Sequence, residues 1–184
     1  MIKKRLPGLG YAADQEIGSV VCKKRNYSFC AYKLCHIPKV RVAVVTPIHY
    51  SPKSAAKLWR RYIRLAPWYD EAKEMAVVLI LNTKLQVTAF SLISIGTLNE
   101  SIVHARDVFR PAIALNAYSI ALMHNHPSGD PKPSKADLEL TTDLREAGKL
   151  IGIFLEDHII IGAGNLFFSF DPYGIASAAS RLDV

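Results

Sequence analysis

The fold of this chain is decided by residues 118–151, YSIALMHNHPSGDPKPSKADLELTTDLREAGKLI. An apolar strand signal comes first, a turn rich in proline and glycine follows, and an amphipathic helix is predicted to begin near Lys135. The apolar residues of this helix recur at the spacing of one helical face: Leu140, Leu144, Ala147 and Ile151. A strand that runs through a polar turn into a helix predicts a domain in which both kinds of element share a core.

Further strands and helices are predicted on both sides of this stretch. Strand signals occupy residues 39–47, 74–81, 85–95, 153–161 and 166–170, and residues 82–84 join the second and third signals as a hairpin. Amphipathic helices are predicted over residues 54–65 and 107–117, with Pro111 tolerated only near the start of the second helix. One face of the first helix carries Ala55, Leu58, Tyr62 and Leu65. Mixed strands and helices in one pair of layers predict an α+β fold, α/β-like where the two alternate.

Length and composition predict one domain with an extension. Half of the 184 residues are apolar and 21% are charged, which suffices for a core and excludes a disordered or fibrous chain. The longest uninterrupted apolar run, residues 75–81, is far shorter than the about 20 residues of a membrane-spanning helix, so no membrane partner is expected. The basic N-terminus lacks the apolar stretch of a secretory signal. The three cysteines, an odd number, argue against a disulfide framework and favour a cytoplasmic protein: Cys22, Cys30 and Cys35.

The net charge of +7 lies entirely at the front of the chain. Residues 1–51 hold nine basic side chains against two acidic ones, whereas residues 52–184 hold 14 of each sign. We therefore separate a basic N-terminal extension (1–51) from the rest of the chain. The basic run at residues 23–25 stands beside Tyr27 and Phe29, a combination that can contact phosphates and stack on bases. This predicts a nucleic-acid partner for residues 1–51; the alternative is an unstructured, positively charged tail.

The polar turn carries the strongest chemical signal, His124-x-His126 followed by Asp137. Residues i and i+2 of a strand point to the same face, about 6.5–7 Å apart, so two imidazoles can converge on one ion. The prolines and Gly129 allow Asp137 to fold back as a third ligand. Two histidines and one carboxylate leave a fourth position for water, as in catalytic zinc sites. Two alternatives stand beside this hypothesis: ordinary surface histidines, and a helix cap formed by Ser134-x-x-Asp137. The cap and the metal site are compatible if one carboxylate oxygen faces the ion.

A metal-activated water needs a proton acceptor, for which Glu74 is the first candidate. It opens a strongly apolar run, where a charge has no packing value. The alternative interpretation is a solvated strand end, like that of Lys73. Glu71 and Glu100 are weaker candidates for the same role.

Other polar residues admit two interpretations each. Cys22, Cys30, Cys35 and His36 either form a structural zinc site or, as their spacing favours, remain free thiols. His158, beside Asp157, either orients a metal ligand from outside or is a hydrogen-bonded core histidine. Asn125 faces the opposite side of the strand from its neighbours and is interpreted as structural.

These residues resemble the signature of the RadC-type JAB/MPN+ (JAMM) domain. The block HNHPSGDPKPSKAD at residues 124–137 carries the likeness, with LNTK at 81–84, GTLN at 96–99, DVFR at 107–110 and DHIIIG at 157–162. The resemblance covers roughly residues 52–175, so it implies a domain over residues 52–175 and a C-terminal tail over residues 176–184. It implies a single JAB/MPN domain, in which a curved mixed β-sheet is flanked by helices. Two departures from the family pattern are Ala76, where an aromatic residue is usual, and HARD at 104–107 in place of His-Pro-Arg-Glu.

The resemblance also implies a function. It implies one catalytic Zn²⁺ held by His124, His126 and Asp137. Glu74 would be the general acid/base, and the Ser134 hydroxyl would orient the tetrahedral intermediate. The implied activity is zinc-dependent hydrolysis of amide or isopeptide bonds, with a peptide or a ubiquitin-like-modifier-type protein as substrate. The competing hypothesis is a DNA-repair-related protein that binds nucleic acid through residues 1–51 without peptidase activity; the helical DNA-binding module of longer members is not visible there.

Overall fold

The fold is known from a computed structural model, which describes residues 42–96 and 103–171. Several predictions therefore lie outside the described residues. They are the extension up to residue 41, including the cysteine group and the proposed nucleic-acid contacts, the turn at residues 97–99, and the tail at residues 176–184.

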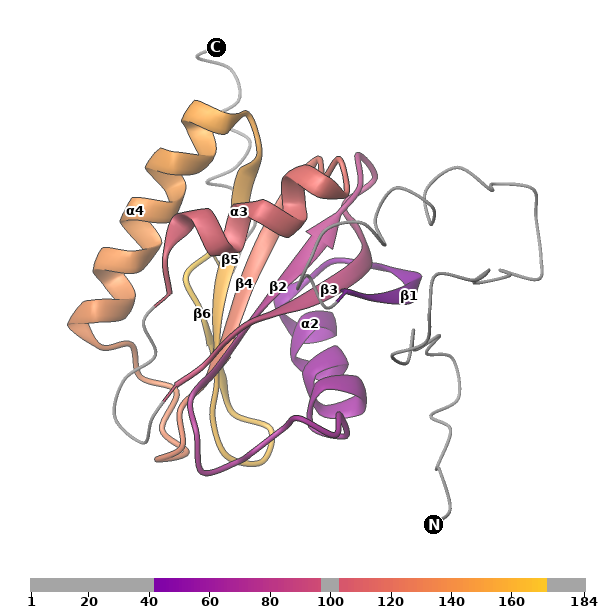
Figure 1. The fold of residues 1–184 in the computed structure, drawn as a ribbon. Coiled ribbons are helices and arrows are strands. Elements are labelled where there is room, and N and C mark those ends of the chain that lie inside the picture. Colours follow the sequence, from indigo (N-terminus) through magenta and orange to yellow (C-terminus); the bar gives the residue numbers. More distant parts are fainter. Residues whose placement is uncertain (1–41, 97–102, 172–184) are drawn as a thin grey trace.

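A six-stranded sheet forms the centre of the described domain (Figure 1). In chain order the elements are β1 (Val42–His49), α2 (Pro52–Leu58), η1 (Trp59–Ile63), β2 (Met75–Leu81), β3 (Gln86–Ile95), α3 (Ala105–Ala114), β4 (Ser119–Asn125), α4 (Lys135–Ile151), β5 (Phe154–Ile161) and β6 (Phe167–Ser169). The strand order is β1-β3-β2-β4-β5-β6, and only β4 and β5, joined through α4, are parallel. The expected mixed sheet and α+β class are thus confirmed.

Helices cover both faces of this sheet, which explains the long apolar runs. In Figure 1, α3 and α4 lie on one face and α2 lies on the other. Two buried clusters correspond to these faces, one with Trp59 and Ile63 of η1, the other with Phe109 of α3 and Leu144 of α4. Every residue of the central strands β2 and β4 is buried, because a strand covered on both faces is apolar throughout instead of alternating.

The first predicted helix has a different inner face from the one expected. The α-helix α2 passes into the π-helix η1, where the Arg64 N–H donates to Trp59 O over five residues. A π-turn holds more residues than an α-turn and rotates the buried side of the helix. Trp59 and Ile63 are consequently buried, whereas Leu65 is 58% exposed, so its assignment to the core was wrong.

The two later helices also differ from the predictions. Pro111 is the seventh residue of α3, so the expectation that it lies near the helix start was wrong. On α4 the buried face begins at the site residue Asp137 and continues through Thr141, Leu144 and Gly148. Leu140 and Ala147 flank this face, while Ile151, predicted to be inward, is 43% exposed. The helix ends at Gly152, whose φ of 78° is the left-handed conformation that favours glycine.

No helix among the described residues has the length and apolar character needed to span a membrane.

Candidate metal centre

His124 and His126 lie at the end of β4, beside the parallel strand β5. His124 pairs with Ile160 in the β4–β5 ladder, and the His126 N–H donates to Ile161 O just beyond the end of β4. Their ring centroids are 5.0 Å apart, as expected for residues i and i+2 on one face of a strand. His124 is buried, whereas 16% of the His126 side chain is exposed, so the centre is more accessible from the side of His126.

Asp137 is held by the start of α4. Ser134 is the N-cap residue, and its hydroxyl accepts a hydrogen bond from the Asp137 N–H at 3.2 Å. The Ser134 N–H and hydroxyl both donate to Asp137 Oδ2, each at 2.7 Å. Because the cap occupies Oδ2, Oδ1 is left to face His124 Nε2 at 3.1 Å. The capping box predicted from the sequence is therefore present together with a carboxylate oxygen directed at the histidines.

Two nitrogens and both carboxylate oxygens of Asp137 converge at this point. The Nε2 atoms of His124 and His126 are 3.1 Å apart, Asp137 Oδ1 lies 3.1 Å from His124 Nε2, and Asp137 Oδ2 lies 3.5 Å from His126 Nε2. Tetrahedral zinc with bonds of about 2.0–2.1 Å places its ligand atoms about 3.3–3.4 Å from one another. The Nε2–Nε2 distance and the Nε2–Oδ1 distance are close to this spacing.

The outer nitrogen of each ring determines which atom faces the centre. His126 Nδ1 lies 2.8 Å from Asp130 O, which can only accept, so Nδ1 carries the proton. His124 Nδ1 lies 2.8 Å from His158 Nε2, and His158 Nδ1 lies 2.7 Å from the Thr141 hydroxyl. That hydroxyl donates to Asp137 O, so it accepts from His158 Nδ1. His158 Nε2 then accepts from His124 Nδ1, and both converging Nε2 atoms are left with lone pairs.

Lone pairs on two neighbouring nitrogens and a carboxylate oxygen are complementary to a cation. Without a cation, a proton can take its place on a facing Nε2 atom and form a hydrogen bond to Asp137. Burial would raise the pKa of Asp137, but such hydrogen bonds with His124 and His126 outweigh it and hold that pKa far below its usual range. The hydrogen bond with Asp137 raises the pKa of His126, so a proton can occupy the same point in competition with a metal ion. Burial lowers the pKa of His158 well below its ordinary value, so this ring stays neutral.

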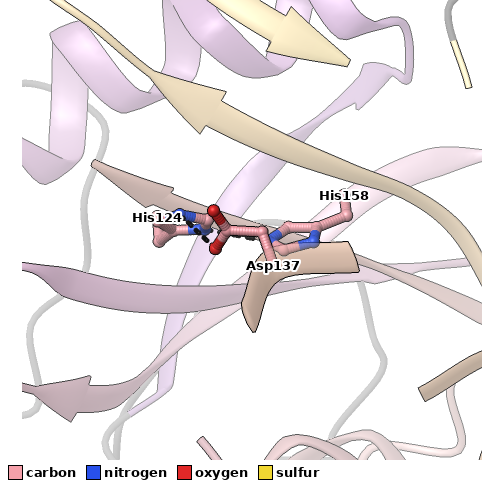
Figure 2. Close-up of side chains that lie close together, drawn as sticks. All are labelled: His124, Asp137 and His158. Atoms are coloured by element: carbon pink, nitrogen blue, oxygen red, sulfur yellow. Dashed lines mark hydrogen bonds and ion pairs between the residues drawn. The ribbon is translucent and has the colours of Figure 1, made fainter. Parts of the chain in front are cut away.

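His158 is the third histidine of the centre. Figure 2 shows His124, Asp137 and His158 close together, and one possible ligand atom from each lies within 4.8 Å of the others, so this buried group can hold a metal ion. His158 is completely buried and its ring stacks on Phe170 at a centroid distance of 5.0 Å. Both of its nitrogens already have partners, in His124 and Thr141. Of the two sequence interpretations of His158, contact with His124 favours the one in which it orients that ring.

Glu74 comes to this centre through the β2–β4 pairing. Ala76 of β2 forms the last pair of the β2–β4 ladder with His124, and Glu74 lies two residues before Ala76, just beyond the end of the ladder. The Glu74 carboxyl group lies near the centre, where it interacts electrostatically with His124, His126 and Asp137. Its carboxyl group is half-buried, and burial raises its pKa, while the charges of His124 and His126 act in the opposite direction. The rival Glu71 instead forms an exposed ion pair with Arg64 at 2.8 Å, and Glu100 lies outside the described residues.

Two residues of this region had no functional role in the sequence interpretation. Thr141 had only one available signal, its position one helical turn after Asp137. Asn125 is buried and bonds to the main chain on either side of Glu74. A pocket of about 180 Å³ adjoins the end of β4 at Asn125 and His126, and its walls include Arg60 and Arg64.

The fold and the centre together define a class of protein: an α+β domain in which a central strand of a mixed sheet ends at a buried histidine–carboxylate group that can hold a metal ion. The chain belongs to the RadC-like JAB domain family, because the sequence model of that family matches residues 50–175. The family expected from the block at residues 124–137 is thus confirmed.

Similar proteins are known from several bacteria under the name UPF0758. The Desulforamulus reducens protein is 54% identical over 106 residues, which is 58% of this chain and 46% of that protein. The Clostridium acetobutylicum protein is 49% identical over 172 residues, 94% of this chain and 68% of that protein. For Trichlorobacter lovleyi the identity is 48% over 106 residues, 58% of this chain and 46% of that protein. The chain thus spans about half the length of two of these relatives, and their names state no activity.

Proposed function

We propose that this domain is a zinc-dependent hydrolase of amide or isopeptide bonds, with His124, His126 and Asp137 as metal ligands. The observation that carries the proposal is the convergence of two imidazole Nε2 atoms, 3.1 Å apart, with the Asp137 carboxylate, whose oxygens lie 3.1 Å from the first nitrogen and 3.5 Å from the second. Imidazole and carboxylate ligands suit zinc, and three protein ligands leave a coordination position open. The ion supplies Lewis acidity, which polarises a carbonyl group and lowers the pKa of a water molecule to about 7.

His126, in preference to His158, is proposed as the third ligand. Its Nε2 faces His124 Nε2, and its outer nitrogen is fixed by Asp130 O. His158 uses one nitrogen on Thr141 and the other on His124. A histidine in that position orients a ligand and keeps the correct nitrogen unprotonated, which is a common outer contact of metal-bound histidines.

Glu74 is proposed as the general acid/base. Its carboxylate would accept a proton from the attacking water and then deliver that proton to the departing amine nitrogen, so the group returns to its starting state. Its position just beyond the Ala76–His124 pair, within electrostatic reach of both histidines, supports this role. Its raised pKa also supports it, because proton transfer is most efficient when the pKa of the catalytic group approaches the working pH.

Ser134 is proposed to orient the tetrahedral intermediate of the substrate. In the substrate-free centre its hydroxyl donates to Asp137 Oδ2, so it would have to rotate toward the substrate. The Ser134 N–H donates to the same oxygen at 2.7 Å and would continue to hold it. The proposed substrate is a peptide or a ubiquitin-like-modifier-type protein, by analogy with the JAMM domains that this chain resembles.

Metal content measured beside hydrolysis tests the proposal. Glu74→Gln is expected to keep one zinc per chain and to lose hydrolysis by about 10²–10⁴-fold. His126→Ala is expected to lose zinc and activity together. Glu139→Gln is the matched control, because Glu139 is an exposed carboxylate paired with Lys135 and is not part of the pocket wall, and it should change neither quantity. Full activity of Glu74→Gln on any amide that the native protein cleaves would refute the role of Glu74, and zinc-free native protein after preparation without chelators would refute the metal site.

A second proposal rests on the charge of residues 1–51, which carry the whole net charge of +7. We propose that this segment contacts nucleic acid through its basic run at residues 23–25. Binding through several phosphates should fall by orders of magnitude between about 50 and 200 mM salt. Replacing Lys23, Lys24 and Arg25 by alanine together should reduce both the affinity and its dependence on salt. Equal binding by this variant would exclude the run as the contact.

A further inference from the structure

Asn125 stands between His124 and His126 but faces the other side of β4. Its amide Oδ1 accepts a hydrogen bond from the Met75 N–H at 3.0 Å, and its Nδ2 donates to Lys73 O at 3.0 Å. These are the main-chain groups immediately before and after Glu74. Only one orientation of the amide satisfies both bonds, because Met75 needs an acceptor and Lys73 O needs a donor.

The two bonds occur where the ladder between the strands stops. The last pair of the β2–β4 ladder is Ala76 with His124, so strand pairing with β4 does not hold Lys73, Glu74 or Met75. The Asn125 side chain takes the place of a peptide group of β4 at this point. On the other side, the Gly96 N–H donates to Glu74 O at 2.8 Å. The main chain of Glu74 is thus held from both neighbouring strands.

We propose that Asn125 is a positioning residue for Glu74, and that its amide, by holding the main chain on either side of Glu74, keeps this carboxyl group beside the metal centre. The inference rests on the proposed function, in which Glu74 moves the proton. Side chains alternate between the two faces of a strand, so the segment at the end of β4 would have two roles. Residues 124 and 126 would face the metal centre, and residue 125, on the opposite face, would hold the main chain around the acid/base Glu74. Asn125 is itself 4% exposed, so its amide does not have water as an alternative partner.

A purely structural role for Asn125 makes a different prediction. A buried amide that only stabilises the strand end would change the overall stability of the protein, whatever residue occupies position 74. A positioning residue acts through Glu74, so its loss should have no further effect on turnover once Glu74 has been replaced. The two roles therefore differ in a double-mutant cycle.

Hydrogen exchange tests the contact without requiring a substrate. In Asn125→Ala the Met75 amide should exchange about tenfold faster, because its acceptor is gone, while the amides of Val78 to Leu81 keep the native rate. Asn125→Asp keeps the acceptor for Met75 and replaces the donor to Lys73 O by a second acceptor. Ser119→Ala is the matched control, since Ser119 is a buried residue of the same strand whose hydroxyl has no partner among the described residues. A native exchange rate for Met75 in Asn125→Ala, or equal acceleration along all of β2, would overturn the inference.

Turnover provides the second arm. Asn125→Ala is expected to keep its zinc, to lose about 10–100-fold in kcat with little change in KM, and to cause no further loss in a Glu74→Gln background. An equal loss in both backgrounds would reduce Asn125 to a structural residue. If the native protein with its metal hydrolyses no amide, the proposed function fails, and the exchange rate of Met75 still decides whether Asn125 holds the segment around Glu74.

Discussion

The sharpest test of the centre is the replacement of His158 by leucine. Leucine has a volume close to that of histidine, but it offers no acceptor to His124 Nδ1 and no donor to Thr141. Thr141 keeps its bond to Asp137 O, so its hydroxyl stays satisfied. The affected group is therefore the His124 Nδ1–H, whose loss of a buried partner costs about 1–3 kcal/mol.

The metal-free protein can avoid this cost. His124 can move its proton to Nε2 and donate it to Asp137 Oδ1, which is 3.1 Å away. Binding of a metal ion to Nε2 would force the proton back to Nδ1. In His158→Leu this Nδ1–H has no acceptor. The penalty consequently falls on metal binding, where about 1.4–2.7 kcal/mol corresponds to about 10–100-fold in affinity. Folding of the metal-free protein should change much less.

A competitive titration with a chromophoric zinc chelator measures this difference, and thermal unfolding of the metal-free proteins serves as the check on folding. His158→Leu should bind zinc about 10–100-fold more weakly than the native protein. His158→Gln is the rescue variant, because its amide can accept from His124 and donate to Thr141, and it should recover part of the affinity. Native affinity in His158→Leu would refute the orienting role. Complete loss of binding in a folded His158→Leu protein would make His158 a ligand itself and refute the choice of His126.

Three further predictions concern the surroundings of the centre. Burial holds the pKa of His158 well below 6.5, so below about pH 6.5 the unfolded chain binds a proton that the folded chain does not. The free energy of unfolding of the metal-free protein should therefore fall by up to about 1.4 kcal/mol per pH unit as the pH drops below about 6.5, and urea titrations at several pH values should show a flatter dependence in His158→Leu. Ser134→Ala removes the cap of α4 and should lower the free energy of unfolding by about 1 kcal/mol in urea denaturation, and an unchanged midpoint would mean that the cap contributes nothing. Gly162→Ala would place a Cβ 2.6 Å from Gly129 O and 2.8 Å from Pro131 Cδ. It should displace the turn that fixes His126 and weaken zinc binding in the chelator titration. Gly164→Ala is the control: its Cβ would meet open space, so this variant bears only backbone strain and should retain more zinc affinity.

The secondary structure could be predicted where periodicity is local and strong. The all-apolar strand β2, the apolar middle of β4, the hairpin between β2 and β3, and the start of α4 follow directly from residue type and spacing. The inner faces of the helices were predicted less well. Leu65 and Ile151 are apolar and at helical spacing, yet both are exposed. In the first helix, the π-turn at Trp59 changes which residues face the core. In α4, the buried face includes the site residues Asp137 and Thr141, and Ile151 lies outside that face.

The local part of the centre was determined by the sequence alone. His124 and His126 share a face because strand side chains alternate, and Asp137 turns back because a cap at Ser134 binds the residue three positions later. The remaining parts required the tertiary structure. Glu74 comes to the centre because β2 pairs with β4 as far as Ala76 and His124, and His158 reaches His124 through the parallel pairing of β5. The physical reason is that alternation and capping are set by bonds within a few residues, whereas the register between distant strands is set by which faces the whole domain can bury.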